Sequence, residues 1–178
     1  MRTSTIVLGA YLVCVAVASV WRLLPWIGDA IPDVGALTAA YLGLTARRQV
    51  SPAIAGAIVL GYLIDLISGA PPGLIALVLA LTTLITRTMQ QHILVRGLAI
   101  SIAFSAFVAL ISGVLALVIR VVYRMPSAAF VIELQHVAFV TLATAVLGPL
   151  VWRMFRRIDA AFARTHRERD AALEGLAP

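Results

Sequence analysis

Asp65 is the residue whose type and position most clearly call for a chemical role. It lies in an apolar stretch, residues 53–68, that contains no other charge, and Gly69 and the pair Pro71-Pro72 follow it. Burying a carboxylate in hydrocarbon costs a few kcal/mol, so an ionisable side chain there indicates a functional site by default. Two interpretations are open: a structural hydrogen bond that ties two helices together, or a specific functional role.

The catalytic chemistry open to Asp65 is limited by the residues that could join it. An acid–base pair with His136 is the nearest approach to a catalytic arrangement, and no nucleophile accompanies it. His92, His136 and His166 are far apart in sequence and Cys14 is the single cysteine, so no metal centre is predicted. The sequence contains no nucleophile elbow, phosphate-binding loop or dinucleotide fingerprint. We therefore expect no enzymatic activity, no cofactor and no metal.

The composition is that of a membrane protein. Of the 178 residues, 62% are hydrophobic and 12% are charged, and the mean hydropathy is +1.02. Soluble domains have about 45–50% apolar and about 25% charged residues. Repeated long apolar runs then predict an all-α, polytopic membrane helix bundle of about six transmembrane segments.

Turn signals and arginines separate the predicted segments, which together form a transmembrane domain over residues 1–152. The segments are 5–24, 34–46, 52–68, 74–86, 98–123 and 130–152. Pro32-Asp33 is predicted to start the second, because proline fixes φ and an acid in the first turn suits the helix dipole. Its 13 residues reach only ~20 Å against the ~30 Å hydrocarbon core, so it is either an oblique span or a re-entrant segment.

Two smaller features of the segments carry expectations of their own. The small residues Ala16-Val17-Ala18 resemble a signal-peptide cleavage site, but the apolar run continues to Leu24, so we expect an uncleaved first span. Ser101, Ser105 and Ser112 fall close to one face of the fifth segment. They either line a helix contact or bond their own backbone.

The distribution of the arginines along the chain predicts a membrane topology. All 14 basic residues are arginine and the net charge is +6. They cluster at segment ends and no nucleic-acid motif is present, so topology and anionic lipid explain them better than nucleic acid does. With the N-terminus inside, eleven arginines lie inside and only Arg22, Arg120 and Arg124 lie outside. Asp65 falls on the outer side too, so we expect it to be ionised and paired with one of these three arginines.

A basic amphipathic tail is predicted over residues 153–178. Phe155, Ile158 and Phe162 fall on one helical face. Most of the arginines fall opposite, and those assigned to the membrane surface are Arg153, Arg156, Arg157 and Arg164. Such a helix suits the surface of an anionic leaflet, with an acidic groove on a partner protein as the alternative. Disorder is expected after Ala171.

Several motifs together resemble a known family. They are Pro32-Asp33 before the second segment, Gly61-x-x-x-Asp65-Leu-Ile-Ser-Gly69, and the turn through Pro71 to Gly73-Leu74. With the length, the number of spans and the basic C-terminal end, these features resemble the rod shape-determining protein MreD family over nearly the whole chain. By this resemblance the motif residues have structural or partner-binding roles.

The resemblance implies a non-enzymatic, multi-pass scaffold in the bacterial inner membrane with a cytoplasmic C-terminus. Its partners would be the bitopic protein MreC, the glycosyltransferase RodA with a class-B penicillin-binding protein, and the cytoplasmic MreB. The family is also similar in fold to the substrate-binding subunits of energy-coupling-factor vitamin transporters, which leaves such a subunit as the alternative function. A vitamin site needs convergent polar groups and aromatics, whereas this sequence lacks Asn and Lys and has 7% aromatic residues.

Overall fold

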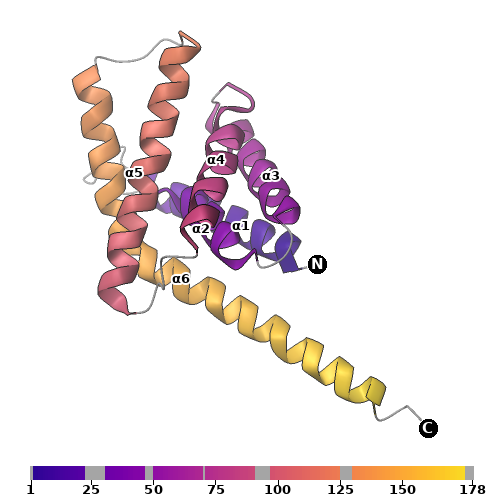
Figure 1. Ribbon diagram of the computed structural model, residues 1–178. Helices are drawn as coiled ribbons and strands as arrows, with labels where there is room; N and C mark the ends of the chain where they lie inside the picture. Colours follow the sequence, from indigo (N-terminus) through magenta and orange to yellow (C-terminus); the bar gives the residue numbers. More distant parts are fainter. Residues whose placement is uncertain are drawn as a thin grey trace.

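The described part of the chain is folded into six helices. The computed structural model describes residues 2–22, 31–46, 50–69, 71–90, 97–124 and 130–174, without the side chains of residues 2, 21, 22 and 162–174. The helices are α1 (Arg2–Arg22), α2 (Val34–Thr45), α3 (Ser51–Ser68), α4 (Leu74–Met89), α5 (Leu98–Val122) and α6 (Phe130–Glu174) (Figure 1). Each predicted apolar segment corresponds to one helix, which confirms the all-α prediction.

Four of these helices are long and apolar enough to cross a membrane. They are α1, α3, α5 and α6, counted over the described residues. The other two, α2 with 12 residues and α4 with 16, reach only about 18 and 24 Å, which is less than a hydrocarbon core. The shortness of the second segment is thus confirmed, and the fold is that of a membrane protein.

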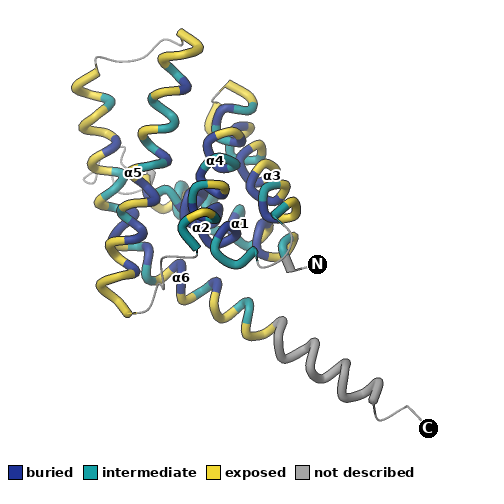
Figure 2. The backbone as a smooth tube through the Cα atoms, in the orientation of Figure 1, coloured by how far each residue is buried: buried dark blue, intermediate teal, exposed yellow. Residues whose placement is uncertain are grey.

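The short helix α2 lies at the centre of the bundle. All of its residues from Val34 to Gly43 are buried, and it packs against each of the other five helices (Figure 2). Irregular backbone at membrane depth is tolerated only where protein covers it. Both ends of α2 meet this condition, because Asp33 caps its start and Arg87 of α4 donates to the carbonyl of Ala46 at its end.

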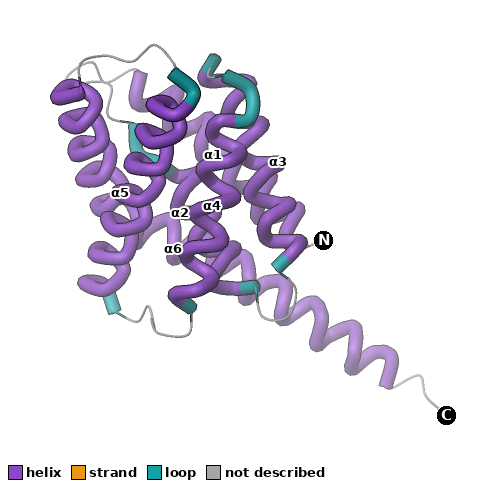
Figure 3. The backbone as a smooth tube through the Cα atoms, turned by 45° about the horizontal axis from the view of Figure 1, so that its top comes forward, coloured by secondary structure: helices purple, strands orange, loops and turns teal. Residues whose placement is uncertain are grey.

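The remaining helices form two antiparallel hairpins, α3–α4 and α5–α6. Figure 3 shows both hairpins beside α2, and Figure 1 shows that the α3–α4 turn lies at the same end as the end of α5 and the start of α6. Arg120 and Arg124 therefore lie at this end, whereas Arg87 and Arg153 lie at the other. These four arginines are divided between the two ends as the topology prediction has them.

Helix α6 runs through the predicted boundary at 152/153. It is continuous from Phe130 to Glu174 with Pro149 inside it. Proline removes one backbone hydrogen bond and favours a bend, and Figure 1 shows the helix turning into an arm that leaves the bundle. The helix also runs through residues 172–174, where disorder was expected, and residues 175–178 lie outside the description.

The first turns of the predicted tail belong to the core. Phe155 is fully buried, its ring centroid is 5.0 Å from that of Tyr41, and Ile158 packs against the same cluster. The Tyr41 hydroxyl donates a hydrogen bond to the carboxylate of Asp159. The bundle therefore covers this apolar face at Phe155 and Ile158, whereas the side chain of Phe162 lies outside the described residues. Arg153, Arg156 and Arg157 are exposed on the outer face, and the Arg164 side chain is not described.

Candidate functional site

Asp65 caps the beginning of the next helix. The residue is 2% exposed, and its carboxylate accepts hydrogen bonds from the backbone amides of Gly73, Ile75 and Ala76 at 2.9, 3.0 and 3.3 Å. The first amides of a helix have no acceptor within the helix, and Gly73 at the N-cap of α4 has no side chain to supply one. Asp65 supplies it from α3, and its charge lies at the positive end of the α4 dipole.

The turn between α3 and α4 aims these amides at Asp65. Gly69 and Gly73 have φ of 66° and 95°, the left-handed region that glycine adopts without strain. The carbonyl of Pro71 accepts from the amide of Leu74 and closes the turn. The predicted stop after Ser68 is confirmed, and the turn returns the chain so that α4 begins against the last turn of α3.

Gly61 lets the two helices come this close. A Cβ atom added at Gly61 would lie 2.4 Å from the Cα and 2.6 Å from the amide nitrogen of Ala76. Residues four apart share one face of a helix, so Gly61 and Asp65 both face the first turn of α4. The Gly61-x-x-x-Asp65 motif therefore combines a close backbone contact with a cap for the helix that makes it.

Of the three arginines predicted as possible partners of Asp65, the structure pairs neither Arg120 nor Arg124 with it. Arg120 bonds Glu133 of α6 at 3.2 Å, while Arg124 is exposed just after α5, and the Arg22 side chain lies outside the described residues. Backbone amides replace the arginine because the start of α4 offers three of them within reach of one carboxylate. The structural interpretation of Asp65 is the one that this geometry supports.

Exchanging the charges of the Arg120–Glu133 pair tests this assignment. Arg120→Glu alone brings two carboxylates together and is expected to destabilise the α5–α6 hairpin by about 1 kcal/mol, a modest effect because the pair is partly exposed. Glu133→Arg in the same chain should restore the loss, as measured by thermal unfolding in detergent micelles. The same restoration from Asp65→Arg combined with Arg120→Asp would contradict the assignment.

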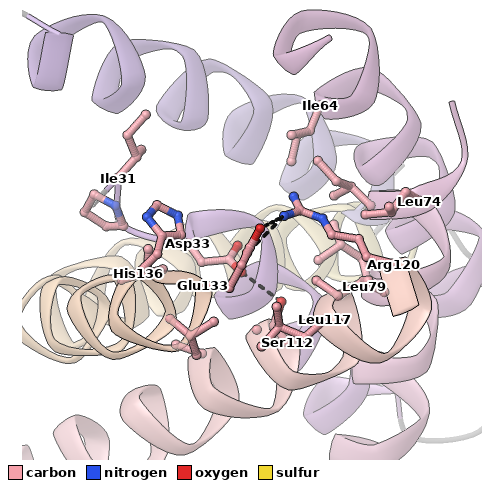
Figure 4. Close-up of a pocket in the computed structure, with 18 residues that line it drawn as sticks. Ile31, Asp33, Ile64, Leu74, Leu79, Ser112, Leu117, Arg120, Glu133 and His136 are labelled. Atoms are coloured by element: carbon pink, nitrogen blue, oxygen red, sulfur yellow. Dashed lines mark hydrogen bonds and ion pairs between the residues drawn. The ribbon is translucent and has the colours of Figure 1, made fainter. Parts of the chain in front are cut away.

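A cavity of about 300 Å³ opens between the two hairpins, at the end of the bundle where α2 begins. Figure 4 shows the polar side chains that converge on it from α5, from α6 and from the loop before α2. They are Asp33, Ser112, Arg120, Glu133 and His136. The other lining residues are almost all aliphatic, and none is Phe, Tyr or Trp. The cavity can therefore take a small molecule with both polar and apolar parts.

Asp33 anchors one wall of this cavity. One carboxylate oxygen accepts from the amide of Ala36 at 2.8 Å, which caps α2, and the other accepts from the Ser112 hydroxyl at 2.8 Å. Its own amide donates to the hydroxyl oxygen of Thr144 at 2.9 Å. The predicted helix start is confirmed with one adjustment: Asp33 is the N-cap, and Pro32 lies just outside the helix.

The hydroxyl groups divide between the two predicted roles. Ser101 and Ser105 bond their own backbone, to the carbonyls of Gly97 and Ser101, whereas Ser112 reaches across to Asp33. Sequence reasoning missed Thr144, which bonds both the carbonyl of Val140 and the amide of Asp33. No signal in the sequence distinguishes a threonine that bonds another segment from one that bonds only the backbone of its own helix.

Comparisons of the chain with protein-family models, with curated proteins and with solved structures find no match. Within the described residues, no group of three or more His, Cys, Asp or Glu is placed to hold a metal ion. The chain's own residues therefore offer two features from which to infer function: the capped α3–α4 junction and the polar cavity beside α2.

Proposed function

We propose that the chain is a non-enzymatic scaffold of the bacterial cell-elongation machinery, of the kind that the MreD family provides. The observation that carries the proposal is the arrangement at Asp65. The carboxylate of the motif is occupied by three amides of its own chain, so the motif that the resemblance rests on acts as a rigid joint. A rigid joint is what a protein needs when its task is to present fixed surfaces to partners.

The surfaces available for partners agree with such a role. Outward-facing apolar side chains cover the outer halves of α5 and α6, among them Val121, Phe130 and Val131. A bitopic partner such as MreC, and the membrane-embedded RodA with its class-B penicillin-binding protein, would pack there within the bilayer. The helical arm that leaves the bundle would face the cytoplasm, where MreB and anionic lipid lie. In this arrangement the chain lies in the inner membrane.

The alternative is a substrate-binding subunit of an energy-coupling-factor-type vitamin transporter. The cavity beside α2 favours it, because five polar side chains line this one cavity. The lack of aromatic residues in the lining argues against it, since vitamin rings are usually held by aromatic side chains.

Affinity purification from native membranes, followed by mass spectrometry, distinguishes the two functions. We expect wild type to recover MreC and the cell-wall synthases. An Asp65→Asn variant, compared at equal amounts of folded protein by size-exclusion chromatography, should recover less of them because the α3–α4 joint is loosened. Recovery of a transporter's membrane and ATPase subunits would favour the alternative, and recovery of neither set would overturn the proposal.

A further inference from the structure

A second cavity lies at the opposite end of the α5–α6 hairpin, where α5 begins and α6 bends at Pro149. Its volume is about 200 Å³. It is lined by Gly97, Leu98, Ser101, Trp152, Arg153 and Arg156. Neither the joint at Asp65 nor the cavity beside α2 uses these residues. The lining contains hydrogen-bond donors and positive charge, and no Asp or Glu.

The N-terminal turn of a long helix lines this cavity. Helix α5 has 25 residues, and its N-cap is Gly97, which has no side chain to accept a hydrogen bond from the first amides. The amides of the first turn have no acceptor within the helix, and the dipole gives this end a partial positive charge. An anion is the ligand that such a helix end favours.

Trp152 supplies an independent sign that an acceptor belongs here. The residue lines the cavity and is only 4% exposed, and its indole N–H has no hydrogen-bond partner in the described part of the chain. The rings of Tyr41 and Phe104 contact the indole at centroid distances of 5.3 and 5.7 Å, and both contacts are edge-on aromatic packing. A buried donor without an acceptor is costly, so an acceptor bound in the cavity would remove a cost that the described residues leave in place.

Arg153 and Arg156 add full positive charge at the mouth of the cavity. Both are exposed and lie on the turn of α6 that follows Trp152. The planar guanidinium of arginine bonds phosphate oxygens in pairs. Helix amides, an indole N–H and guanidinium groups together match an acceptor that is compact, anionic and rich in oxygen.

We propose that this cavity binds a phosphate group. The amides at the start of α5 and the Trp152 indole hold its inner oxygens, and Arg153 holds an outer one. The group belongs either to an anionic lipid, whose acyl chains would lie along α5 and α6, or to a free phosphate ion. The site is independent of the scaffold function, because neither its residues nor its test involves a partner protein.

The experiment follows the indole N–H of Trp152 directly. The protein, labelled with ¹⁵N and held in maltoside micelles at fixed salt, is titrated with short-chain phosphatidylglycerol and, separately, with inorganic phosphate. Trp152→Phe serves only to assign the resonance. We expect the indole resonance to move downfield as the donor gains an acceptor. A response to the lipid alone identifies a headgroup site, and a response to both identifies a general phosphate site.

Arg157 provides the matched control. It is exposed on the same helix and carries the same charge, but it does not line the cavity. Arg153→Gln should weaken binding about tenfold, as expected when one charged hydrogen bond is lost, while Arg157→Gln should change the affinity less than about twofold. An indole resonance that neither probe moves, or equal weakening by the two arginine variants, would overturn the site.

Discussion

Gly61→Ala is expected to lower the free energy of unfolding by about 2–3 kcal/mol, because overpacking forces the backbone to shift. The added methyl group would lie 2.4 to 2.9 Å from three backbone atoms of Ile75 and Ala76. Backbone atoms cannot rotate away as a flexible side chain can, so α3 and α4 must separate. That separation also pulls the α4 amides away from Asp65, and the variant loses part of the cap as well.

Gly9→Ala is the control for this prediction. Gly9 is also inside an apolar helix, but the nearest atom to its added Cβ is a methyl carbon of Ile158 at 4.0 Å, an ordinary contact. Alanine is the better helix former by about 1 kcal/mol, so this variant should be neutral or slightly more stable. Thermal or denaturant unfolding in the same detergent compares the two, and equal losses would show that Gly61 is not a contact point.

The helices were predictable because their signal is local. Long apolar runs bounded by Pro, Gly and Arg mark the spans directly. The apolar run of residues 34–46 is too short for a full membrane span, and the corresponding helix α2 is short in the structure. The stop at Gly69 followed from the same kind of signal. These predictions needed only the chemistry of neighbouring residues.

The partner of Asp65 was not predictable in the same way. The sequence shows that a carboxylate in hydrocarbon needs a partner, and the charge count offered three arginines. The partners that the structure shows are backbone amides of Gly73, Ile75 and Ala76, and every residue except proline carries an amide N–H, so no residue type reveals them. The signal that was present was the double glycine turn, which returns the chain within reach of the carboxylate.

What covers the apolar face of the tail could not be predicted, for a related reason. The helical spacing of Phe155 and Ile158 correctly indicated a face that something must cover, but the pattern is identical whether lipid or protein covers it. The answer depended on a tertiary contact, because Phe155 packs against the ring of Tyr41 in α2. The cavity is also a tertiary property, since Asp33, Ser112 and Glu133 meet from three separate segments.

Asp65→Ala is expected to be the most damaging single polar substitution, with a loss of about 3–5 kcal/mol, because one buried and two partly buried amides lose their acceptor at once. Asp65→Asn should cost about half as much. One asparagine oxygen can still accept, but the amide nitrogen that replaces the other oxygen brings a donor against donors. Unfolding in detergent micelles, with protease resistance of the α3–α4 turn as a second readout, measures both losses.

Asp33→Asn is the matched control, because Asp33 is also a helix cap but has a different set of partners. Its second oxygen accepts from the hydroxyl of Ser112, and a hydroxyl can turn to accept from the asparagine nitrogen. Asparagine is also a good N-cap, so Asp33→Asn should cost less than about 1 kcal/mol. If Asp33→Asn and Asp65→Asn were equally damaging, burial of charge and not the number of amide donors would explain the effect.

The two large effects should also be coupled, since Gly61 and Asp65 act on the same first turn of α4. Once Gly61→Ala has pushed α4 away, the carboxylate has fewer bonds left to lose. The double variant Gly61→Ala with Asp65→Ala should therefore cost less than the sum of the two single losses, by about 1 kcal/mol or more, as is usual for residues that share a contact. Strict additivity would mean that the close contact and the cap stabilise the hairpin independently, and the motif would then not act as one joint.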